Sequence, residues 1–102
     1  MKKMLAEKTV EVNEEGYLLQ FAQWDKDIAN AIAVEEKVEL IDRHWKAIEW
    51  IQNEYKNDSP LSIRGIKNSG TLNIKEFYEL FPGGPLKKAS KIAGIPKPKS
   101  CI

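Results

Sequence analysis

The stretch LFPGGPLKKASKIAG, residues 80–94, contains the signals that decide where the last part of the chain turns and where it is helical. Prolines and glycines at residues 82–85 break any regular element that precedes them. Pro85 suits the first position of a helix, because its missing N–H group would have no partner there. Gly94 suits the position just after a helix, where the backbone often turns left-handed. The pattern therefore predicts a helix from Pro85 to Ala93.

A different kind of segment, IPKPKSCI, follows that helix. Pro96 and Pro98 restrict the backbone and remove two hydrogen-bond donors, which favours an extended polyproline-type conformation. At about 3.1 Å per residue, such a segment carries Cys101 roughly 20 Å from the last helix. We therefore predict a single helical domain over residues 1–94 and a mobile C-terminal arm over residues 95–102.

The sequence pattern in the rest of the domain predicts a mainly α fold with minor β structure: a compact small helical bundle with an N-terminal β-hairpin. Thr9–Val12 alternates with the period of a strand and Tyr17–Leu19 follows a turn, so these two segments are expected to pair. Apolar residues at helical spacing, bounded by capping and breaking residues, predict the earlier helices. Those helices cover residues 25–36, 42–56 and 62–67, and a further one begins after Asn73.

Two of these helices have specific boundary and packing signals. Asp42 is the expected N-cap of the long helix, whose apolar face includes Trp45, Ile48, Ile51 or Gln52, and Tyr55. Asn73 and Glu76 have the spacing of a capping box. Phe77, Leu80 and Phe81 follow at the spacing of core positions.

The distribution of charge is uneven along the 102 residues, although the formal net charge is only +1. All 15 acidic residues lie before Leu80, together with 11 of the 16 basic residues, so this part carries about −4. The remainder has lysines and no acidic side chain. Since residues 1–12 lack the apolar core of a signal peptide, we expect a cytoplasmic protein. A single cysteine cannot form an internal disulfide, which fits a reducing compartment.

Cys101, the only cysteine, is the residue with the clearest chemical potential. Thiol chemistry proceeds through the thiolate, which nearby cations such as Lys97 and Lys99 favour and the terminal carboxylate opposes. A thiol on an arm suits entry into the active site of another protein. It does not suit catalysis within this chain.

The sequence resembles the DsrC/TusE family of small sulfur-metabolism proteins. The resemblance covers nearly the whole chain from Gly16, and its most specific part is KIAGIPKP, residues 91–98, with the penultimate Cys101. It also includes the run at residues 80–85 quoted above. The resemblance implies a helical bundle with an N-terminal hairpin and a mobile arm. It further implies that Cys101 carries sulfur as a persulfide or mixed adduct.

One departure from the family pattern favours one type of function over another. The resemblance implies that the sulfite-reductase type has a second cysteine eleven residues before the penultimate one, where this chain has Ser90. A serine cannot form a disulfide, so a single-thiol sulfur relay of the TusE type fits better. The alternative is an accessory (gamma) subunit, or partner, of a dissimilatory-type sulfite reductase. Sulfur-donor and sulfur-acceptor proteins, or that reductase, are the expected partners.

Further residues are candidates for contact with a partner or with the arm: Lys97, Lys99, Lys91, Arg64 and Trp50. Trp24 and Trp45 fit core positions instead, and His44 is expected to be a structural or surface histidine. No metal or cofactor is expected, because the chain has one histidine, one cysteine and no phosphate-binding or dinucleotide motif. Any enzymatic activity would be a sulfur transfer carried out with partner proteins.

A helix-turn-helix DNA-binding regulator is a further alternative, because the chain has several short helices joined by tight turns. The sequence pI of about 7.8 lies below the strongly basic range of a nucleic-acid binder. Nucleic acid is therefore not expected as the main partner, and no membrane is expected.

Overall fold

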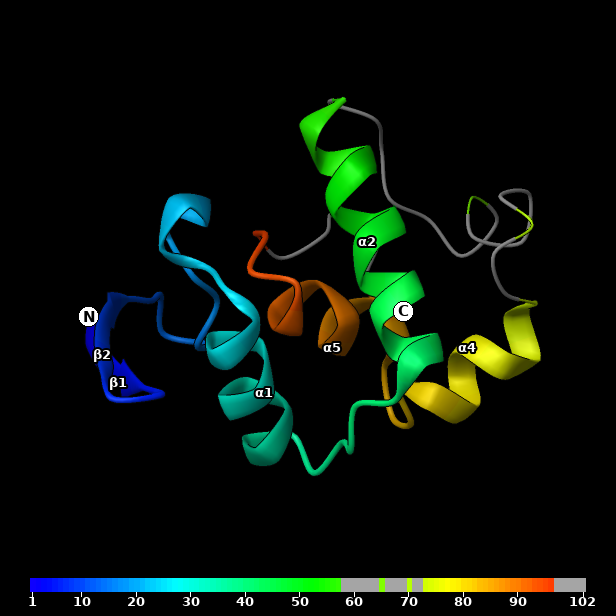
Figure 1. The fold of residues 1–102 in the computed structure, drawn as a ribbon, viewed down its shortest axis with the longest axis horizontal. Helices are drawn as coiled ribbons and strands as arrows, with labels where there is room; N and C mark the ends of the chain where they lie inside the picture. Colours follow the sequence, from blue (N-terminus) through cyan, green and yellow to red (C-terminus); the bar gives the residue numbers. More distant parts are fainter. Residues whose placement is uncertain (58–64, 66–69, 71–72, 97–102) are drawn as a thin grey trace.

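The computed structural model describes residues 1–57, 65, 70 and 73–96. Within them helices predominate over strands, which confirms the predicted fold class (Figure 1). The elements are β1 (Lys2–Leu5), β2 (Lys8–Glu11), the 3-10 helix η1 (Phe21–Gln23), α1 (Lys26–Glu35), α2 (Asp42–Lys56), α4 (Ile74–Leu80) and α5 (Pro85–Ile92). The helix expected over residues 62–67 falls, apart from Gly65, outside the described residues.

The N-terminal hairpin is present, but its partner strand is not the one we predicted. β2 pairs with β1 in antiparallel register. The predicted pairing with residues 17–19 is reduced to one antiparallel bridge, between Val12 and Leu18. The turn between β1 and β2 explains the error: Ala6 and Glu7 take φ angles of 52° and 65°. Two-residue turns of that conformation are usually marked by glycine or asparagine, and neither is present.

α1 begins where the sequence predicts. The Asp25 side chain accepts a hydrogen bond of 2.8 Å from the Ile28 backbone N–H, so Asp25 is the N-cap. The same carboxylate forms an ion pair with Lys8 of β2, which joins the hairpin to the helix. This hydrogen-bonded pair lowers the pKa of Asp25 and raises the pKa of Lys8. The buried face is the predicted one: Ile28, Ala29, Ile32 and Ala33.

α2 has the predicted length but is rotated relative to the predicted face. Its N-cap is Ile41 rather than Asp42. The buried residues are His44, Ala47, Ile48 and Ile51. Trp45, expected in the core, is only partly buried, as is Trp24, and Tyr55 is 41% exposed. The face differs because a histidine with both ring nitrogens hydrogen-bonded can replace an apolar residue in the core.

α4 and α5 follow the sequence signals closely. The Asn73 side chain accepts a hydrogen bond of 2.7 Å from the Glu76 backbone N–H, as an N-cap does. Phe77 and Phe81 are fully buried, while Leu80 packs against the core from a partly buried position. α5 has Pro85 at its first turn. It lies at the centre of the molecule, where it packs against α1, α2 and α4 (Figure 1).

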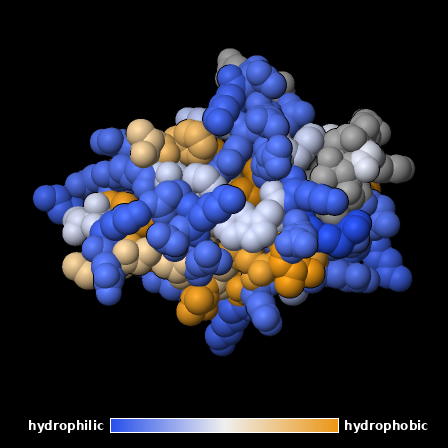
Figure 2. All heavy atoms as spheres, viewed as in Figure 1, coloured by the Kyte–Doolittle hydropathy of each residue, from blue (hydrophilic) through white to orange (hydrophobic). Residues whose placement is uncertain are grey.

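The surface in the view of Figure 2 is largely hydrophilic, with smaller hydrophobic patches along its lower edge. Among the described residues, the exposed large hydrophobic side chains are scattered over several elements, which is normal for a protein surface. They are Met1, Met4, Leu19, Val34, Ile41, Tyr55 and Tyr78. None of the described helices is both long and apolar enough to cross a membrane.

The core extends one residue further along the chain than predicted. Ile95, which we expected to begin the arm, is 1% exposed and belongs to the hydrophobic core. Pro96 is exposed. The body of the domain therefore includes Ile95, and the mobility of the residues that follow stays a prediction.

Two truncations test this boundary. Removing residues 97–102 is expected to change the free energy of unfolding by less than about 0.5 kcal/mol, as changes at the surface usually do. Removing residues 95–102 is expected to lower it by about 2–5 kcal/mol, because a buried isoleucine is lost. Urea denaturation of both variants measures the difference. Equal stability of the two truncated proteins would contradict the assignment of Ile95 to the core.

Candidate functional site: the root of the C-terminal arm

Cys101 lies outside the described residues, together with the candidate residues Lys97, Lys99 and Arg64. The structure does describe the point where the chain leaves α5 toward Cys101. We call residues 90–96 the arm root. The geometry of the arm root decides where the arm begins and in which direction it starts.

The backbone of the arm root forms the hydrogen-bond pattern of a Schellman motif. The Gly94 N–H donates to the Lys91 carbonyl at 3.2 Å, and the Ile95 N–H donates to the Ser90 carbonyl at 3.2 Å. Gly94 has a φ angle of 77°, in the left-handed region that glycine adopts without a steric penalty. The last turn of α5 is thereby closed, and Ile95 is directed into the core.

Two side chains from distant elements bind the carbonyl groups that remain at the end of α5. Trp24 donates from its indole Nε1 to the Ile92 carbonyl at 2.8 Å. Gln52, on α2, donates from Nε2 to the Ala93 carbonyl at 2.8 Å. Helix ends leave carbonyl groups without partners inside the helix, and leaving them unpaired in a buried place is costly. Together, Trp24 and Gln52 attach the arm root to the body of the protein.

Trp24 also covers Gly94 so closely that no side chain fits there. A Cβ atom at position 94 would lie 2.3 Å from the Cδ1 atom of Trp24 and 2.6 Å from its Cγ atom. On its other side Trp24 belongs to an aromatic cluster with Phe21 and Tyr55. The Phe21 ring stacks at 6.2 Å from Trp24, and Tyr55 meets Phe21 edge-on at 5.8 Å. This cluster joins η1 to the end of α2 beside the arm root.

Lys91, a predicted contact for a partner or the arm, is engaged within the domain. Its ammonium group lies 2.7 Å from the Glu36 carboxylate, at the end of α1. The two side chains are only 17% and 22% exposed. Its stem also approaches Gly16, where a Cβ atom would lie 2.9 Å from the Cε atom of Lys91. Contact with a partner or the arm stays a prediction for this residue.

Trp50, another predicted contact, is partly buried on the outer side of α2. It lines a cavity of about 380 Å³ together with Lys46, Glu49, Asn53 and Gly70. Contact of Trp50 with a partner or the arm also stays a prediction.

His44 has a structural role, as the sequence suggested. Its Nδ1 atom accepts a hydrogen bond of 3.1 Å from the Ile41 backbone N–H, and its Nε2 atom lies 2.8 Å from the Leu80 carbonyl. Both ring nitrogens of the imidazole therefore have a backbone hydrogen-bond partner. The ring also meets Phe81 edge-on at 5.0 Å. In the part of the chain that the structure describes, no three His, Cys, Asp or Glu side chains are grouped as metal ligands.

Ser90 lies inside the domain, on the buried face of α5. It is 0% exposed, and its hydroxyl group has no hydrogen-bond partner among the described residues. A buried hydroxyl without a partner loses its hydration and receives nothing in return. The side chain at this position therefore occupies space in the core without contributing a polar interaction.

The match to known proteins covers nearly the whole chain. Residues 4–102 match the family model described as DsrC like protein. The chain belongs to the DsrC-like family. The Sulfurtransferase TusE homolog of Haemophilus influenzae is 40% identical over 101 residues, which cover 91% of this chain and 93% of that protein.

Solved structures of DsrC-like proteins share the fold. A chain in a crystal structure of dissimilatory sulfite reductase I (DsrI) is 34% identical, with a TM-score of 0.87 and full coverage of both chains. The NMR structure of Allochromatium vinosum DsrC is 30% identical with a TM-score of 0.84, again over the full length of both. These likenesses confirm the DsrC/TusE resemblance that the sequence indicated.

The contacts that attach the arm root were not predicted, although one signal pointed to each of them. Gly94 was predicted only as a helix stop, and Gln52 only as a neighbour of the apolar face of α2. Trp24 was assigned to packing alone. Hydrogen bonds between residues 41 to 68 positions apart depend on the assembled fold, so local patterns do not reveal them.

Substitution of two glycines separates backbone strain from the Trp24 contact. Gly70 and Gly94 have nearly equal φ angles, 76° and 77°, but nothing lies within 4 Å of a Cβ atom at Gly70. Gly70→Ala is expected to lower the free energy of unfolding by about 1–2 kcal/mol, the cost of a left-handed alanine. Gly94→Ala is expected to cost at least about 1–3 kcal/mol more, because the Trp24 ring must move. Equal losses in thermal and urea unfolding would refute the close packing of Trp24 on the arm root.

A second pair of substitutions tests the unpaired hydroxyl. Ser90→Ala is expected to leave the free energy of unfolding unchanged or to raise it by up to about 1 kcal/mol, since an unsatisfied buried group is removed. The matched change Ala89→Ser, at a fully buried neighbour, is expected to lower it by about 1–3 kcal/mol. A loss of more than about 1 kcal/mol in Ser90→Ala would mean that the hydroxyl is hydrogen-bonded in solution.

Proposed function

We propose that this protein is a sulfur-relay carrier of the TusE type, which accepts persulfide sulfur on Cys101 and passes it on. The observation that carries the proposal is the likeness to a sulfurtransferase TusE homolog over 91% of the chain. The structure adds a last helix whose end is anchored by Trp24 and Gln52, at the point where the predicted arm begins. Cytoplasmic location and partner proteins that donate and accept sulfur belong to the same proposal.

The transfer on Cys101 requires no change in overall oxidation state. The Cys101 thiolate attacks the terminal sulfur of a donor persulfide, so that a new S–S bond forms and the donor S–S bond breaks. The donor leaves as a thiolate, and Cys101 holds one additional sulfur atom. An acceptor thiolate then attacks that outer sulfur and releases the Cys101 thiolate. Each step is a thiol–disulfide type exchange, and the chain supplies the carrying thiol.

The anchored arm root supports this function through reach and direction. Trp24 and Gln52 fix the end of α5, while an extended segment from Pro96 to Cys101 would place the thiol about 15 Å from Pro96. A carrier has to present the same sulfur atom to a donor and an acceptor in turn. A fixed origin with an extended arm reduces the number of positions that the thiol samples, which lowers the entropy cost of entering a partner's active site.

Ser90 supports a single-thiol relay over the two-cysteine chemistry implied for the sulfite-reductase type. The position belongs to the buried face of α5, and a serine oxygen cannot form a disulfide with Cys101. The second candidate function is an accessory subunit of a dissimilatory-type sulfite reductase. It is favoured by the structural likeness to a chain in the DsrI crystal structure, at a TM-score of 0.87.

Loading with a persulfide donor tests the proposed carrier. Reduced protein is expected to gain the mass of one sulfur atom, about 32 Da, and dithiothreitol is expected to remove it, because the sulfur is held by a reducible S–S bond. Intact-protein mass spectrometry measures both changes. Cys101→Ser is the control and is expected to gain nothing, while Ser90→Ala is expected to load normally.

Two outcomes would contradict the carrier function. If no persulfide donor loads the protein, and it co-purifies stoichiometrically with a sulfite reductase, the accessory-subunit function takes its place. Such a stable interface would bury at least about 1,200 Å². If the protein loads but sulfur never passes to a second protein, Cys101 is only a reactive terminal thiol.

A further inference from the structure

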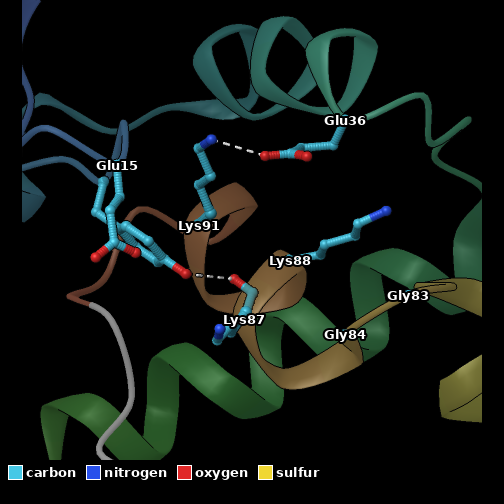
Figure 3. Close-up of a pocket in the computed structure, with 8 residues that line it drawn as sticks. Glu15, Glu36, Gly83, Gly84, Lys87, Lys88 and Lys91 are labelled. Carbon is cyan, nitrogen blue, oxygen red and sulfur yellow. Dashed lines mark hydrogen bonds and ion pairs between the residues drawn. The ribbon is translucent and has the colours of Figure 1, made fainter. Parts of the chain in front are cut away.

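A small basic pocket lies beside α5, on the side that faces the end of α1. It has a volume of about 220 Å³, and its lining includes Lys87, Lys88 and Lys91 of α5 and the turn at Gly83 and Gly84 (Figure 3). α5 thus supplies three lysines to one pocket, and the same helix ends at the arm root.

The three lysines are not equivalent. Lys91 is turned toward Glu36 and is neutralised by it, as the dashed line in Figure 3 marks. Lys87 and Lys88 point elsewhere, and within residues 1–57 and 73–96 neither has a carboxylate partner in an ion pair. The Lys87 backbone is fixed, because its carbonyl accepts a hydrogen bond of 3.3 Å from the Tyr17 hydroxyl. Lys87 and Lys88 therefore lie on a rigid helix, and neither forms an ion pair with another described residue.

The size of the pocket limits what it can hold. Sites for small-molecule ligands usually have about 300–1,000 Å³, so 220 Å³ is small for a substrate or cofactor. The volume suits one or two carboxylate side chains presented by another protein. A lysine ammonium group recognises a carboxylate as a compact point charge.

The charges around the pocket favour an acidic protein segment over a nucleic acid. Glu15 and the Lys91–Glu36 ion pair line the same pocket, so a continuous chain of phosphates would meet carboxylates as well as lysines. Residues 1–79, the part of the chain before Leu80, carry a net charge of about −4. This negative charge further disfavours binding of a nucleic acid, whose phosphates are negative along its whole length. A partner protein can place single carboxylates beside Lys87 and Lys88 while the rest of its surface makes no contact with Glu15 and Glu36.

We propose that the pocket at Lys87 and Lys88 docks an acidic segment of the protein that exchanges sulfur with the arm. The inference rests on the proposed carrier function and names the surface that recognises the partner. Lys87 and Lys88 precede Gly94 by six or seven residues, which along a helix is about 10 Å. A partner seated there lies within the reach of about 15 Å expected of an extended arm that starts at Pro96. The body would then bind the partner while the arm delivers the thiol.

Peptide titration of the full-length ¹⁵N-labelled protein tests the proposal without thiol chemistry. Hexaglutamate is the probe, and the measurement is the change in amide chemical shifts at about 20 mM and about 150 mM salt. The largest changes are expected at residues 83–91, and they are expected to weaken at the higher salt concentration. Lys87→Glu with Lys88→Glu is expected to weaken binding by about tenfold or more.

A matched variant separates the pocket from net charge. Lys46→Glu with Lys75→Glu changes the net charge equally at two exposed lysines on α2 and α4, and is expected to leave the affinity within about twofold. The proposal is overturned if hexaglutamate does not bind, if its shifts centre on other lysines, or if both double variants weaken binding equally. It is also overturned if a short RNA oligonucleotide binds residues 83–91 more tightly than hexaglutamate.

The docking proposal and the carrier proposal can fail separately. Lys46→Glu with Lys75→Glu is expected to load with sulfur from a small-molecule persulfide at the wild-type rate, since the thiol is unchanged. If the native protein does not bind hexaglutamate but loads normally with sulfur, only the docking proposal is contradicted. Failure of Cys101 to load would remove the carrier function, whatever the peptide does.

Discussion

The end of α5 is the point on which the rest of the structure depends, because its buried carbonyl groups must find partners there. The Schellman motif satisfies the carbonyls of Ser90 and Lys91, and Trp24 and Gln52 satisfy those of Ile92 and Ala93. Each unsatisfied buried carbonyl would cost about 1–3 kcal/mol, a considerable fraction of the stability of a domain of this size. α5 also packs against α1, α2 and α4, so its position couples the other helices to the origin of the arm. A change that displaces Trp24 or Gln52 therefore acts on the fold and on the direction of the arm together.

In the proposed function, this coupling gives the predicted arm a fixed origin on a packed body. The body contains Ile95 as its last buried residue, and the aromatic cluster of Phe21, Trp24 and Tyr55 stands beside it. Recognition of a partner and chemistry on the sulfur have opposite structural requirements. Recognition benefits from groups held on rigid elements, whereas a thiol that visits two active sites has to leave the body. In the proposed function, α5 serves the first requirement with its lysines and the second by ending where the arm starts.

Local signals in the sequence predicted α1, α2, α4 and α5, but they did not predict which side chains of α2 face the core. Pro85, Gly94 and Asn73 each act within one turn of the chain, and the structure uses each of them as predicted. The predicted face of α2 was right at Ile48 and Ile51 and wrong at Trp45 and Tyr55. His44 is buried instead through partners at Ile41 and Leu80, and the second partner comes from another helix. The strand β1 was missed because its turn uses Ala6 and Glu7 in place of glycine or asparagine. The two errors have different causes. The α2 error comes from a contact that forms only after the chain folds, and the β1 error comes from a turn conformation that alanine and glutamate rarely adopt.

The candidate site shows the same division between local and distant information. The family pattern and Cys101 could be read from the sequence, and so could the stop at Gly94. The anchoring of the arm root could not, because Gln52 and Ala93 are 41 positions apart, and Trp24 and Ile92 are 68 apart.

Ser90 connects the fold to the chemistry more closely than its small side chain suggests. With a serine at this buried position, Cys101 has no second cysteine in the chain with which to form an internal disulfide. In the proposed function, sulfur held on Cys101 leaves when a nucleophile from outside, such as an acceptor thiolate, attacks it, because the chain offers no second cysteine for ring closure. Selection among acceptors then depends on which partner is held beside the arm. The proposed docking surface at Lys87 and Lys88 would supply that selection, because it lies on the same helix whose end Trp24 and Gln52 anchor.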